Sequence, residues 1–279
     1  MKRAFVIGHP ISHSKSPILH GHWLDELNID GTYVAIDVAP IDLPEFVDQI
    51  KSGSFIGGNV TVPHKEAVMT LCDKITATAE KIGAVNTLWL EDGRLIGDNT
   101  DKYGFLANLD QRLADWDKEI QNAIVLGAGG AARAVLVGLA ERGFQSIRVL
   151  NRTSDRAQSL CNALNKVFEN KPFVASLLSD FNKLAPHADL IVNTSAVGMG
   201  GTKFQDLDLS LAQTHTIVTD IVYTPLETPL LVDARQAGLR TVDGVGMLLH
   251  QAVPGFERWF GARPTVSSTL REKILGAQS

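Results

Sequence analysis

Cysteine is scarce in this chain, and so are the other marks of a cross-linked or metal-stabilised protein. Its 279 residues contain two cysteines, Cys72 and Cys161, which lie far apart and form no C-x-x-C pattern. Five of the eight histidines fall in the first quarter, but no HExxH-type spacing places two of them on one helix face. We therefore expect no disulfide framework and no metal site.

The chain also lacks a block of basic residues and a long hydrophobic segment at its start. The net charge is −5, so a surface that follows nucleic-acid phosphates has little support. After Lys2 and Arg3, the apolar run 4–8 is too short for the core of a signal peptide. These absences predict a cytoplasmic protein whose partners are small molecules rather than nucleic acids or membranes.

One stretch, residues 123–140, approaches the ~20 apolar residues that a helix needs to cross a bilayer. Four glycines and Arg133 within it argue against that interpretation. An apolar run is followed by G-x-G-x-x-A and an alanine-rich helical pattern, which is typical of a turn that places a pyrophosphate at a helix N-terminus. The sequence therefore predicts a dinucleotide-binding loop of Gly127, Ala128, Gly129, Gly130 and Ala131.

The end of the next expected strand indicates which dinucleotide is bound. NAD-binding folds usually place an acidic residue there for the ribose 2′-hydroxyl, whereas this sequence has Asn151, Arg152 and Thr153. An acid would repel a 2′-phosphate, and a guanidinium can bind it through two hydrogen bonds. We therefore expect NADP, held by the segment Asn151, Arg152, Thr153, Ser154, Asp155 and Arg156.

The hydrophobic pattern alternates strands and helices of lengths typical of α/β proteins. In the first hundred residues we expect helices at 17–27 and 43–50, a hairpin turn at 91–93, and strands at 3–7, 32–37, 57–62, 84–90 and 94–97. A helix at 101–113 leads to further strands at 122–126, 146–151, 173–176, 190–193, 216–220 and 241–242. A last helix at 247–259 has apolar residues at a period near 3.6 and is expected to fold back on the first domain.

This pattern predicts an α/β protein of two domains. A mainly parallel α/β substrate domain covers residues 1–101 and is completed by C-terminal helices at 245–279. A Rossmann-type NADP domain covers residues 102–244. We expect the substrate in a cleft between the two, with hinges near 100–104 and 244–246.

Two serines before Pro17 are candidates for anion binding. Proline is favoured at the first helical position and serine at the N-cap, so Ser16 has a purely structural explanation as a helix cap. The functional alternative is that the hydroxyls of Ser14 and Ser16, with the N–H groups of the helix start, bind a carboxylate.

Lys65 and Asp101 are the candidates for proton transfer. Pro63 is expected to open a helix with Lys65 in its first turn, where a cation opposes the helix dipole, so helix stability does not explain the lysine. A solvent-exposed lysine is the simpler alternative, and Asp101 can be an N-cap or the partner of Lys65. Asn86, in an otherwise apolar strand, and Gln251, beside the apolar face of the last helix, are further polar candidates.

Together the motifs match one family along nearly the whole chain. In order they are SHSKSP, NVTVPHK, GAVNT, DNTD, GAGGAARA, NRTSDRA, NTSAVGM, DIVYTPLETPLL and DGVGMLLHQA. On these motifs the sequence resembles the shikimate dehydrogenases, NADP-dependent enzymes that reduce 3-dehydroshikimate to shikimate in aromatic amino-acid biosynthesis.

The resemblance implies a role for each candidate residue. Ser14 and Ser16 would hold the substrate carboxylate with help from Tyr223, and the ring hydroxyls would contact Thr61, Lys65, Asn86, Asp101 and Gln251. The cofactor would contact the loop 127–131, the segment 151–156, and backbone near Ile221 and Gly244. Lys65 with Asp101 would exchange the proton, and the resemblance does not decide which of them carries it. One departure is Thr76-Ala77-Thr78, where several family members have an acidic residue near the cofactor.

Two alternative functions are compatible with the same motifs. A quinate/shikimate dehydrogenase tolerates an extra ring hydroxyl and often uses NAD, and Ser16 and Arg152 both argue against it. A dinucleotide-sensing regulator would have kept the fold and lost the chemistry, which the intact Lys65 and Asp101 disfavour. A monomer and a homodimer are both compatible with the sequence.

Overall fold

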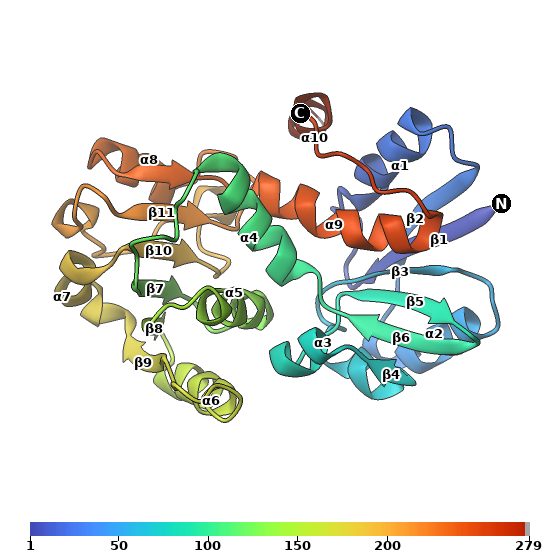
Figure 1. The fold of residues 1–279 in the computed structure, drawn as a ribbon, viewed down its shortest axis with the longest axis horizontal. Coiled ribbons are helices and arrows are strands. Elements are labelled where there is room, and N and C mark those ends of the chain that lie inside the picture. Colours follow the sequence, from blue (N-terminus) through green and yellow to red (C-terminus); the bar gives the residue numbers. More distant parts are fainter. Residues whose placement is uncertain (277–279) are drawn as a thin grey trace. The chain divides into compact units, whose positions relative to one another are not determined.

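The computed structural model describes residues 1–276 and is drawn in Figure 1. The chain forms two compact units. Unit 1 comprises residues Met1–Asp101 and the described residues from Leu249 onward, coloured blue to cyan and red; unit 2 comprises Lys102–Leu248, coloured green to orange.

Unit 1 is built on a mixed six-stranded sheet. Its strands are β1 (Lys2–Gly8), β2 (Gly31–Asp37), β3 (Gly57–Val60), β4 (Lys74–Ile75), β5 (Thr87–Glu91) and β6 (Arg94–Asp98), in the order β2-β1-β3-β5-β6-β4. Its helices are α1 (Ser16–Glu26), α2 (Leu43–Lys51), α3 (Ala77–Ile82) and α10 (Ser268–Gly276), with 3₁₀ turns η1 (Pro40–Asp42) and η2 (Ala67–Leu71). β1 pairs in parallel with β2 and β3, and β5 pairs antiparallel with β3 and β6. The predicted β5–β6 hairpin is confirmed, and it turns at Asp92 and Gly93, which both have positive φ.

Helices cover both faces of this sheet. On α2, the buried Leu43, Phe46, Val47 and Ile50 recur every three or four residues and face the sheet. Phe46 meets Phe5 of β1 edge to face, with ring centroids 5.1 Å apart. The opposite face holds aromatic side chains of α1 and of the end of α9 (Val245–Phe260), where Trp259 Nε1 donates to the Leu88 carbonyl at 2.8 Å. The end of α9 therefore packs on the sheet of unit 1.

Unit 2 is built on a parallel six-stranded sheet. Its strands are β7 (Asn122–Leu126), β8 (Ser146–Asn151), β9 (Phe173–Leu177), β10 (Leu190–Asn193), β11 (Ile217–Asp220) and β12 (Arg240–Val242), in the order β12-β11-β10-β7-β8-β9. Its helices are α4 (Asp101–Arg112), α5 (Gly130–Glu141), α6 (Ser154–Leu164), α7 (Phe181–Leu184), α8 (Pro229–Gln236) and the start of α9, with 3₁₀ turns η3 (Leu178–Asp180), η4 (Ala185–His187), η5 (Met199–Gly201) and η6 (Leu209–Leu211). Every pairing is parallel, and the order reverses between β7 and β10 as in Rossmann folds.

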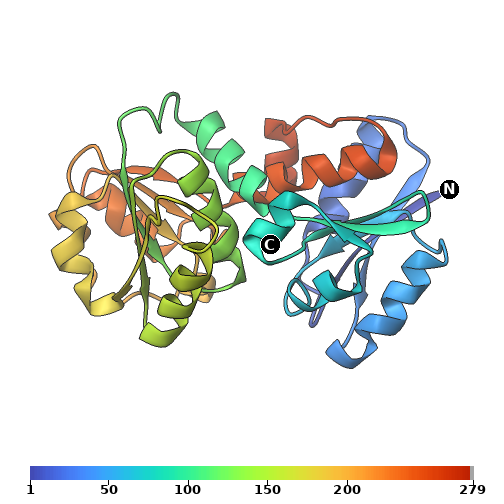
Figure 2. The same ribbon diagram turned by 60° about the horizontal axis from the view of Figure 1, so that its bottom comes forward.

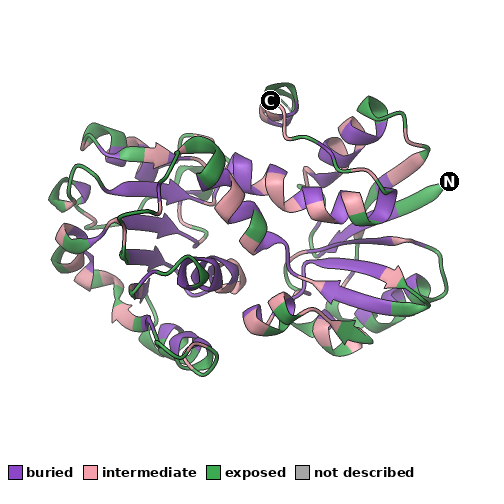
Figure 3. Ribbon diagram, viewed as in Figure 1, coloured by how far each residue is buried: buried purple, intermediate pink, exposed green. Residues whose placement is uncertain are grey.

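The helices of unit 2 form two layers around the sheet. Figure 2 shows α5 and α6 on one face and α7 and α8 on the other. All residues of β10 and β11 are buried, as the purple strands of Figure 3 show. Strands that are covered on both faces have continuous apolar runs instead of alternating apolar and polar residues. The sequence has such continuous runs here.

The helix predicted after Pro63 is wrong. Residues 62–66 form turns, and only η2 follows. The Lys65 carbonyl accepts a hydrogen bond from the Val85 backbone at 2.8 Å, so it is not available to a helix. The helix-dipole argument for Lys65 therefore fails.

The chain passes between the units inside two helices. The first passage is at the start of α4, between Asp101 and Lys102, and the second is within α9, between Leu248 and Leu249. None of the helices among residues 1–276 is long and apolar enough to cross a membrane.

Candidate active site

Ser14 and Ser16 lie at the N-terminus of α1. The N-cap is Lys15, whose side chain makes no capping bond, so the interpretation of Ser16 as the cap is wrong. The Ser14 hydroxyl instead accepts a hydrogen bond from the Ser16 backbone N–H at 3.3 Å. Because that hydroxyl accepts here, its own proton is left to donate to another group. Ser16 is only 7% exposed.

Lys65 and Asp101 form an ion pair in unit 1. Lys65 Nζ lies 2.6 Å from Asp101 Oδ2, with side chains 18% and 10% exposed, so Lys65 is not a solvent-exposed lysine. Asp101 begins α4, and its backbone N–H donates to Asn99 Oδ1 at 3.0 Å. Asn99 therefore supplies the cap-like acceptor, and both Asp101 carboxylate oxygens are used elsewhere. Pairing offsets the cost of burying the two charges.

Asn86 joins this pair through its amide. Its Nδ2 donates to Asp101 Oδ1 at 2.8 Å, and its Oδ1 accepts from the Thr100 backbone and from the Thr87 hydroxyl, both at 2.8 Å. Asn86 precedes β5 instead of lying inside the predicted strand, although its backbone N–H still donates to the Asp98 carbonyl. The structure thus brings together Lys65, Asp101 and Asn86, three of the predicted residues.

Four polar residues behind Asn86 were missed by the sequence reasoning. Asn59, Thr87 and Thr100 are each less than 7% exposed, and Tyr33 is 7% exposed. Tyr33 donates to Asn59 Oδ1 at 2.6 Å, and Asn59 Nδ2 donates to the Asn86 carbonyl at 3.1 Å. The signal that could have found Asn59 is an asparagine in the otherwise apolar strand GGNV.

Thr61 and Gln251 also belong to unit 1. Thr61 follows β3, and its backbone N–H donates to the Ile7 carbonyl at 2.9 Å. Its methyl group packs against Gly8, where an added Cβ would come within 2.6 Å of Thr61 Cγ2. Gln251 is half-buried on α9.

The glycine loop of unit 2 follows β7. Gly127 has φ +104°, and a Cβ there would lie 3.0 Å from Ser195, so both the turn and the close approach favour glycine. The N-cap of α5 is Gly129, and a Cβ added at Gly129 or Gly130 would meet no described atom within 4 Å. The helix N-terminus therefore faces open space that backbone N–H groups line, which fits a pyrophosphate.

The segment 151–156 lies beside that loop because β7 and β8 pair in parallel. Arg156 of α6 donates from Nε to the Ala128 carbonyl at 3.0 Å. Asn151 Nδ2 donates to the Thr153 carbonyl at 2.9 Å, and Thr153 is the N-cap of α6. Arg152, Ser154 and Asp155 are exposed. Two guanidinium groups and no β8 acid fit the 2′-phosphate of NADP.

Ile221 and Gly244 are in direct backbone contact. A Cβ on Gly244 would lie 2.6 Å from the Ile221 carbonyl carbon, so only glycine fits without movement. Asp220, which ends β11, is fully buried and accepts hydrogen bonds from Asn193, Val222 and Thr228. Burial raises the pKa of Asp220 to about 6 against the effect of these donors. Burial also raises the pKa of Tyr223.

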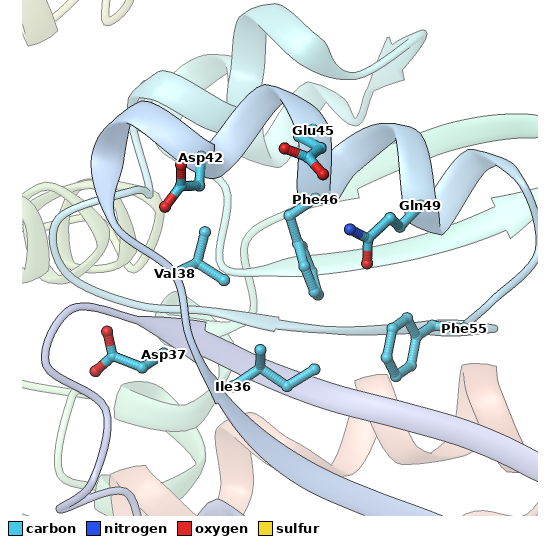
Figure 4. A pocket seen from close by; sticks show the side chains of 8 residues that line it. All are labelled: Ile36, Asp37, Val38, Asp42, Glu45, Phe46, Gln49 and Phe55. Atoms are coloured by element: carbon cyan, nitrogen blue, oxygen red, sulfur yellow. The ribbon is translucent and has the colours of Figure 1, made fainter.

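Other chemistry-bearing groups lie apart from these two constellations. Both cysteines are free, and burial raises the pKa of each thiol to about 11. Within residues 1–276, no group of three His, Cys, Asp or Glu side chains could hold a metal ion. A pocket of about 330 Å³ lies between β2 and α2 and contains none of the predicted residues (Figure 4). Thr76 lies in the segment where several family members have an acidic residue, and its side chain caps α3.

The parallel sheet order, the glycine loop and the buried Lys65–Asp101 pair place the chain among the NADP-dependent oxidoreductases of α/β fold. Three family models match it: the shikimate dehydrogenase substrate binding domain over residues 6–88, shikimate / quinate 5-dehydrogenase over 109–222, and the shikimate 5′-dehydrogenase C-terminal domain over 244–268. The chain belongs to the shikimate dehydrogenase family.

Individual relatives agree with this membership. A shikimate dehydrogenase (NADP⁺) of Mesorhizobium japonicum is 53% identical over 98% of this chain and 96% of its own length. The structure of a Thermus thermophilus shikimate 5-dehydrogenase in complex with NADP(H) and shikimate has a TM-score of 0.86, with 35% identity and full coverage of both chains. A quinate dehydrogenase from Corynebacterium glutamicum in complex with NAD has a TM-score of 0.91, with 31% identity over 99% of each chain.

Proposed function

We propose that the chain catalyses the reversible NADPH-linked reduction of 3-dehydroshikimate to shikimate, a step in aromatic amino-acid biosynthesis. The observation that carries this proposal is the 53% identity to an NADP-dependent shikimate dehydrogenase over 98% of the chain. The cofactor is NADP, in agreement with the guanidinium groups of Arg152 and Arg156 beside the glycine loop.

Unit 1 supplies most of the substrate contacts in this proposal. Ser14 and Ser16 donate hydroxyl hydrogen bonds to the substrate carboxylate, and Tyr223 of unit 2 contributes at the same end. The ring hydroxyls contact Thr61, Lys65, Asn86, Asp101 and Gln251. The hydrogen bond from the Ser16 backbone to Ser14 Oγ supports this assignment because it leaves the Ser14 proton to point elsewhere.

Lys65 and Asp101 transfer the proton to and from the substrate oxygen. In reduction the pair donates a proton to the oxygen that gains charge, and in oxidation it accepts the proton of the same hydroxyl. Their 2.6 Å contact makes them one coupled acid–base unit, so the proton belongs to the pair. Asn86 holds the Asp101 carboxylate in place with a 2.8 Å hydrogen bond.

The cofactor residues lie in unit 2. NADP, when bound, supplies or accepts the hydride. The N–H groups at the start of α5, in the loop 127–131, hold its pyrophosphate, and the guanidinium groups of Arg152 and Arg156 bind its 2′-phosphate. The other cofactor contacts of this segment come from Asn151, Thr153, Ser154 and Asp155. The backbone near Ile221 and Gly244 provides further contacts.

The proposal also covers the partners, the location and the oligomeric state of the enzyme. The partners are the small-molecule substrate and NADP, with no nucleic acid or membrane, and the enzyme works in the cytoplasm. A monomer and a homodimer both fit, because the seven proposed substrate residues of unit 1 and the cofactor residues of unit 2 come from one chain.

The rival activity is quinate oxidation with NAD, for which the similarity to the Corynebacterium glutamicum quinate dehydrogenase is the supporting observation. A spectrophotometric assay that pairs shikimate or quinate with NADP⁺ or NAD⁺ separates the two. Shikimate with NADP⁺ is expected to give the highest kcat/KM. A higher value for quinate with NAD⁺ would replace the proposal by its rival, and no turnover with any pair would favour the regulatory alternative.

Replacing Lys65 tests the proton-transfer role. Lys65→Ala removes a general acid–base group, which is typically worth about 10²–10⁴ in rate, so kcat should fall by that factor with a smaller change in KM. Asp101→Asn should act on the same step, and the double variant should be scarcely slower than the worse single variant.

The control for this prediction is Lys51→Ala. Lys51 is also paired with an aspartate in unit 1, at 2.8 Å from Asp73, and is no part of the proposed site. This variant should keep its kcat within about twofold, because exposed pairs contribute little. Multiplicative losses in the Lys65 and Asp101 double variant would contradict a coupled unit.

A further inference from the structure

Behind the Lys65–Asp101 pair, a directional chain of buried hydrogen bonds runs to Tyr33. Tyr33 of β2 donates to Asn59 Oδ1 at 2.6 Å. Because that oxygen accepts, Asn59 Nδ2 must face the other way, and it donates to the Asn86 carbonyl at 3.1 Å and to Thr87 Oγ1 at 3.3 Å. The Asn86 carbonyl can only accept, so Asn59 Nδ2 faces it, and the Tyr33 hydroxyl supplies the donor that Asn59 Oδ1 needs on the other side.

The series of hydrogen bonds continues in the same donor-to-acceptor direction. Thr87 Oγ1 accepts from Asn59, so its proton goes to Asn86 Oδ1 at 2.8 Å. The Thr100 backbone N–H donates to the same oxygen at 2.8 Å. With Oδ1 fixed by these donors, Asn86 Nδ2 must point at Asp101 Oδ1, at 2.8 Å. The Thr100 hydroxyl also donates to Asn86 Oδ1 at 3.2 Å and lies 3.1 Å from Thr87 Oγ1, so the two threonines hold this oxygen together.

The surroundings keep Tyr33 in place and protonated. Its ring stacks on His20 of α1, with centroids 3.9 Å apart and planes 16° from parallel. Burial raises the pKa of Tyr33 well above its usual value, and the neighbouring Ser16 side chain and Asn59 offset part of that shift. The Tyr33 hydroxyl therefore keeps its proton at neutral pH and can donate it.

We propose that Tyr33 is a positioning residue for the reaction, and that its hydroxyl sets the orientation of the Asp101 carboxylate, and so of Lys65, through Asn59, Thr87 and Asn86. The inference rests on the proposed function, because it assigns Tyr33 to the proton-exchanging pair. The Tyr33 hydroxyl also interacts with the side chain of Ser16, one of the two serines proposed to hold the carboxylate. Tyr33 itself touches none of the reacting groups in this proposal.

Tyr33→Phe removes the hydroxyl and keeps the stacked ring. Without the donor, the buried Asn59 Oδ1 loses its Tyr33 partner, so Asn59 is held less firmly against Asn86 and Thr87, and the Asn86 contact to Asp101 loosens. We expect the single-turnover rate of NADP⁺ reduction by shikimate to fall about 10- to 100-fold, as for a small displacement of a reacting group. The KM for shikimate should change less than kcat, because the substitution acts on the orientation of the proton-exchanging pair and not on substrate binding.

A double-mutant cycle tests the route. Thr87→Val removes the middle link without changing the side-chain shape, and the Tyr33→Phe/Thr87→Val enzyme should be no more than about twofold slower than the worse single variant. Multiplicative losses would overturn the route through Thr87. NADPH affinity, measured by fluorescence titration, should be the same in all three variants, because these residues lie in unit 1.

Thr216→Val is the control for the loss of a buried hydroxyl. Thr216 is fully buried in unit 2, where its hydroxyl donates to the Ala188 carbonyl at 2.7 Å. It should lower the melting temperature about as much as Tyr33→Phe and leave the single-turnover rate unchanged. A Tyr33→Phe enzyme with the wild-type single-turnover rate would overturn the inference, whereas a wild-type protein that does not oxidise shikimate would instead overturn the proposed function.

Discussion

His20 is a fully buried imidazole among the aromatic side chains of unit 1. Neither ring nitrogen has a hydrogen-bond partner among the described residues, and the ring stacks on Tyr33 and Phe256. Burial lowers its pKa to about 3, and the nearby Asn59 side chain offsets part of that shift. His20 is therefore neutral in the folded protein at every pH near neutrality.

This buried histidine predicts an acid-sensitive fold. Between pH 6.5 and 3 the unfolded chain binds a proton at His20 that the folded chain excludes, so stability is fully present above pH 6.5 and is lost as pH falls. The loss at pH 5 should be about 2 kcal/mol. His20→Phe should reduce the difference in unfolding free energy between pH 7.5 and pH 5 by that amount.

Urea unfolding followed by tryptophan fluorescence measures this difference. Three of the four tryptophans, Trp23, Trp89 and Trp259, lie in unit 1 with His20, so most of the signal reports on that unit. A substitution of the exposed His187 of unit 2, such as His187→Gln, should leave the pH dependence unchanged. An identical pH dependence in His20→Phe and wild type would contradict the assignment.

At the scale of elements, the sequence patterns predicted the strands better than the connections. The six strands of unit 2 were located within a residue because buried parallel strands are continuous apolar runs bounded by polar turns. The segment 62–66 was misread as a helix because Pro63 is a common helix start, while the bond from Val85 to the Lys65 carbonyl is a long-range contact. Local sequence does not contain that contact.

The residues of the candidate site were likewise predicted only in part. Lys65, Asp101 and Asn86 were named from the motifs, and the structure joins them by hydrogen bonds. Tyr33 and Asn59 were missed because each is a polar residue in a strand, and such residues are common at exposed edges. The hydrogen bond between them depends on how the strands pair: β1 pairs with both β2 and β3, which brings Tyr33 and Asn59 into contact. Ser16 was misassigned as a cap because the helix starts one residue earlier than expected.

The start of α5 offers a test at the element scale. A Cβ at Gly129 would enter open space, so Gly129→Ala should leave the melting temperature nearly unchanged. The same methyl group would occupy the space that a pyrophosphate needs in order to approach the helix N-terminus, so the Kd for NADPH should rise about tenfold or more. Isothermal titration calorimetry gives this Kd directly.

Gly21→Ala is the matched control for this glycine. Gly21 lies on α1 in unit 1, and a Cβ there also meets no described atom within 4 Å. This variant should bind NADPH as wild type does and gain slightly in stability, because alanine favours a helix. An unchanged NADPH affinity in Gly129→Ala would remove the loop from the cofactor site.

At the scale of the whole molecule, the two units divide the work. The residues proposed for the substrate, apart from Tyr223, lie in unit 1, and those proposed for NADP lie in unit 2. This division explains why motifs spread from Ser14 to Gln251 were all needed to predict one activity, and why a glycine loop alone predicts only a dinucleotide. It also means that substrate and cofactor affinities can be altered separately.

Arg152 tests this separation and the choice of cofactor. It is exposed at the end of β8, beside the loop that Arg156 contacts. Arg152→Ala removes a charge-assisted pair with the 2′-phosphate, worth about 1.5–3 kcal/mol, so the KM for NADPH should rise roughly 10- to 150-fold. The KM for NADH, which has no 2′-phosphate, and the affinity for shikimate should both stay within about twofold.

Steady-state kinetics with each cofactor measures these changes. The control for net charge is Lys183→Ala, which removes a mostly exposed cation from the same unit. Equal losses with NADPH and NADH would show that Arg152 supports the fold of the segment instead of recognising the phosphate.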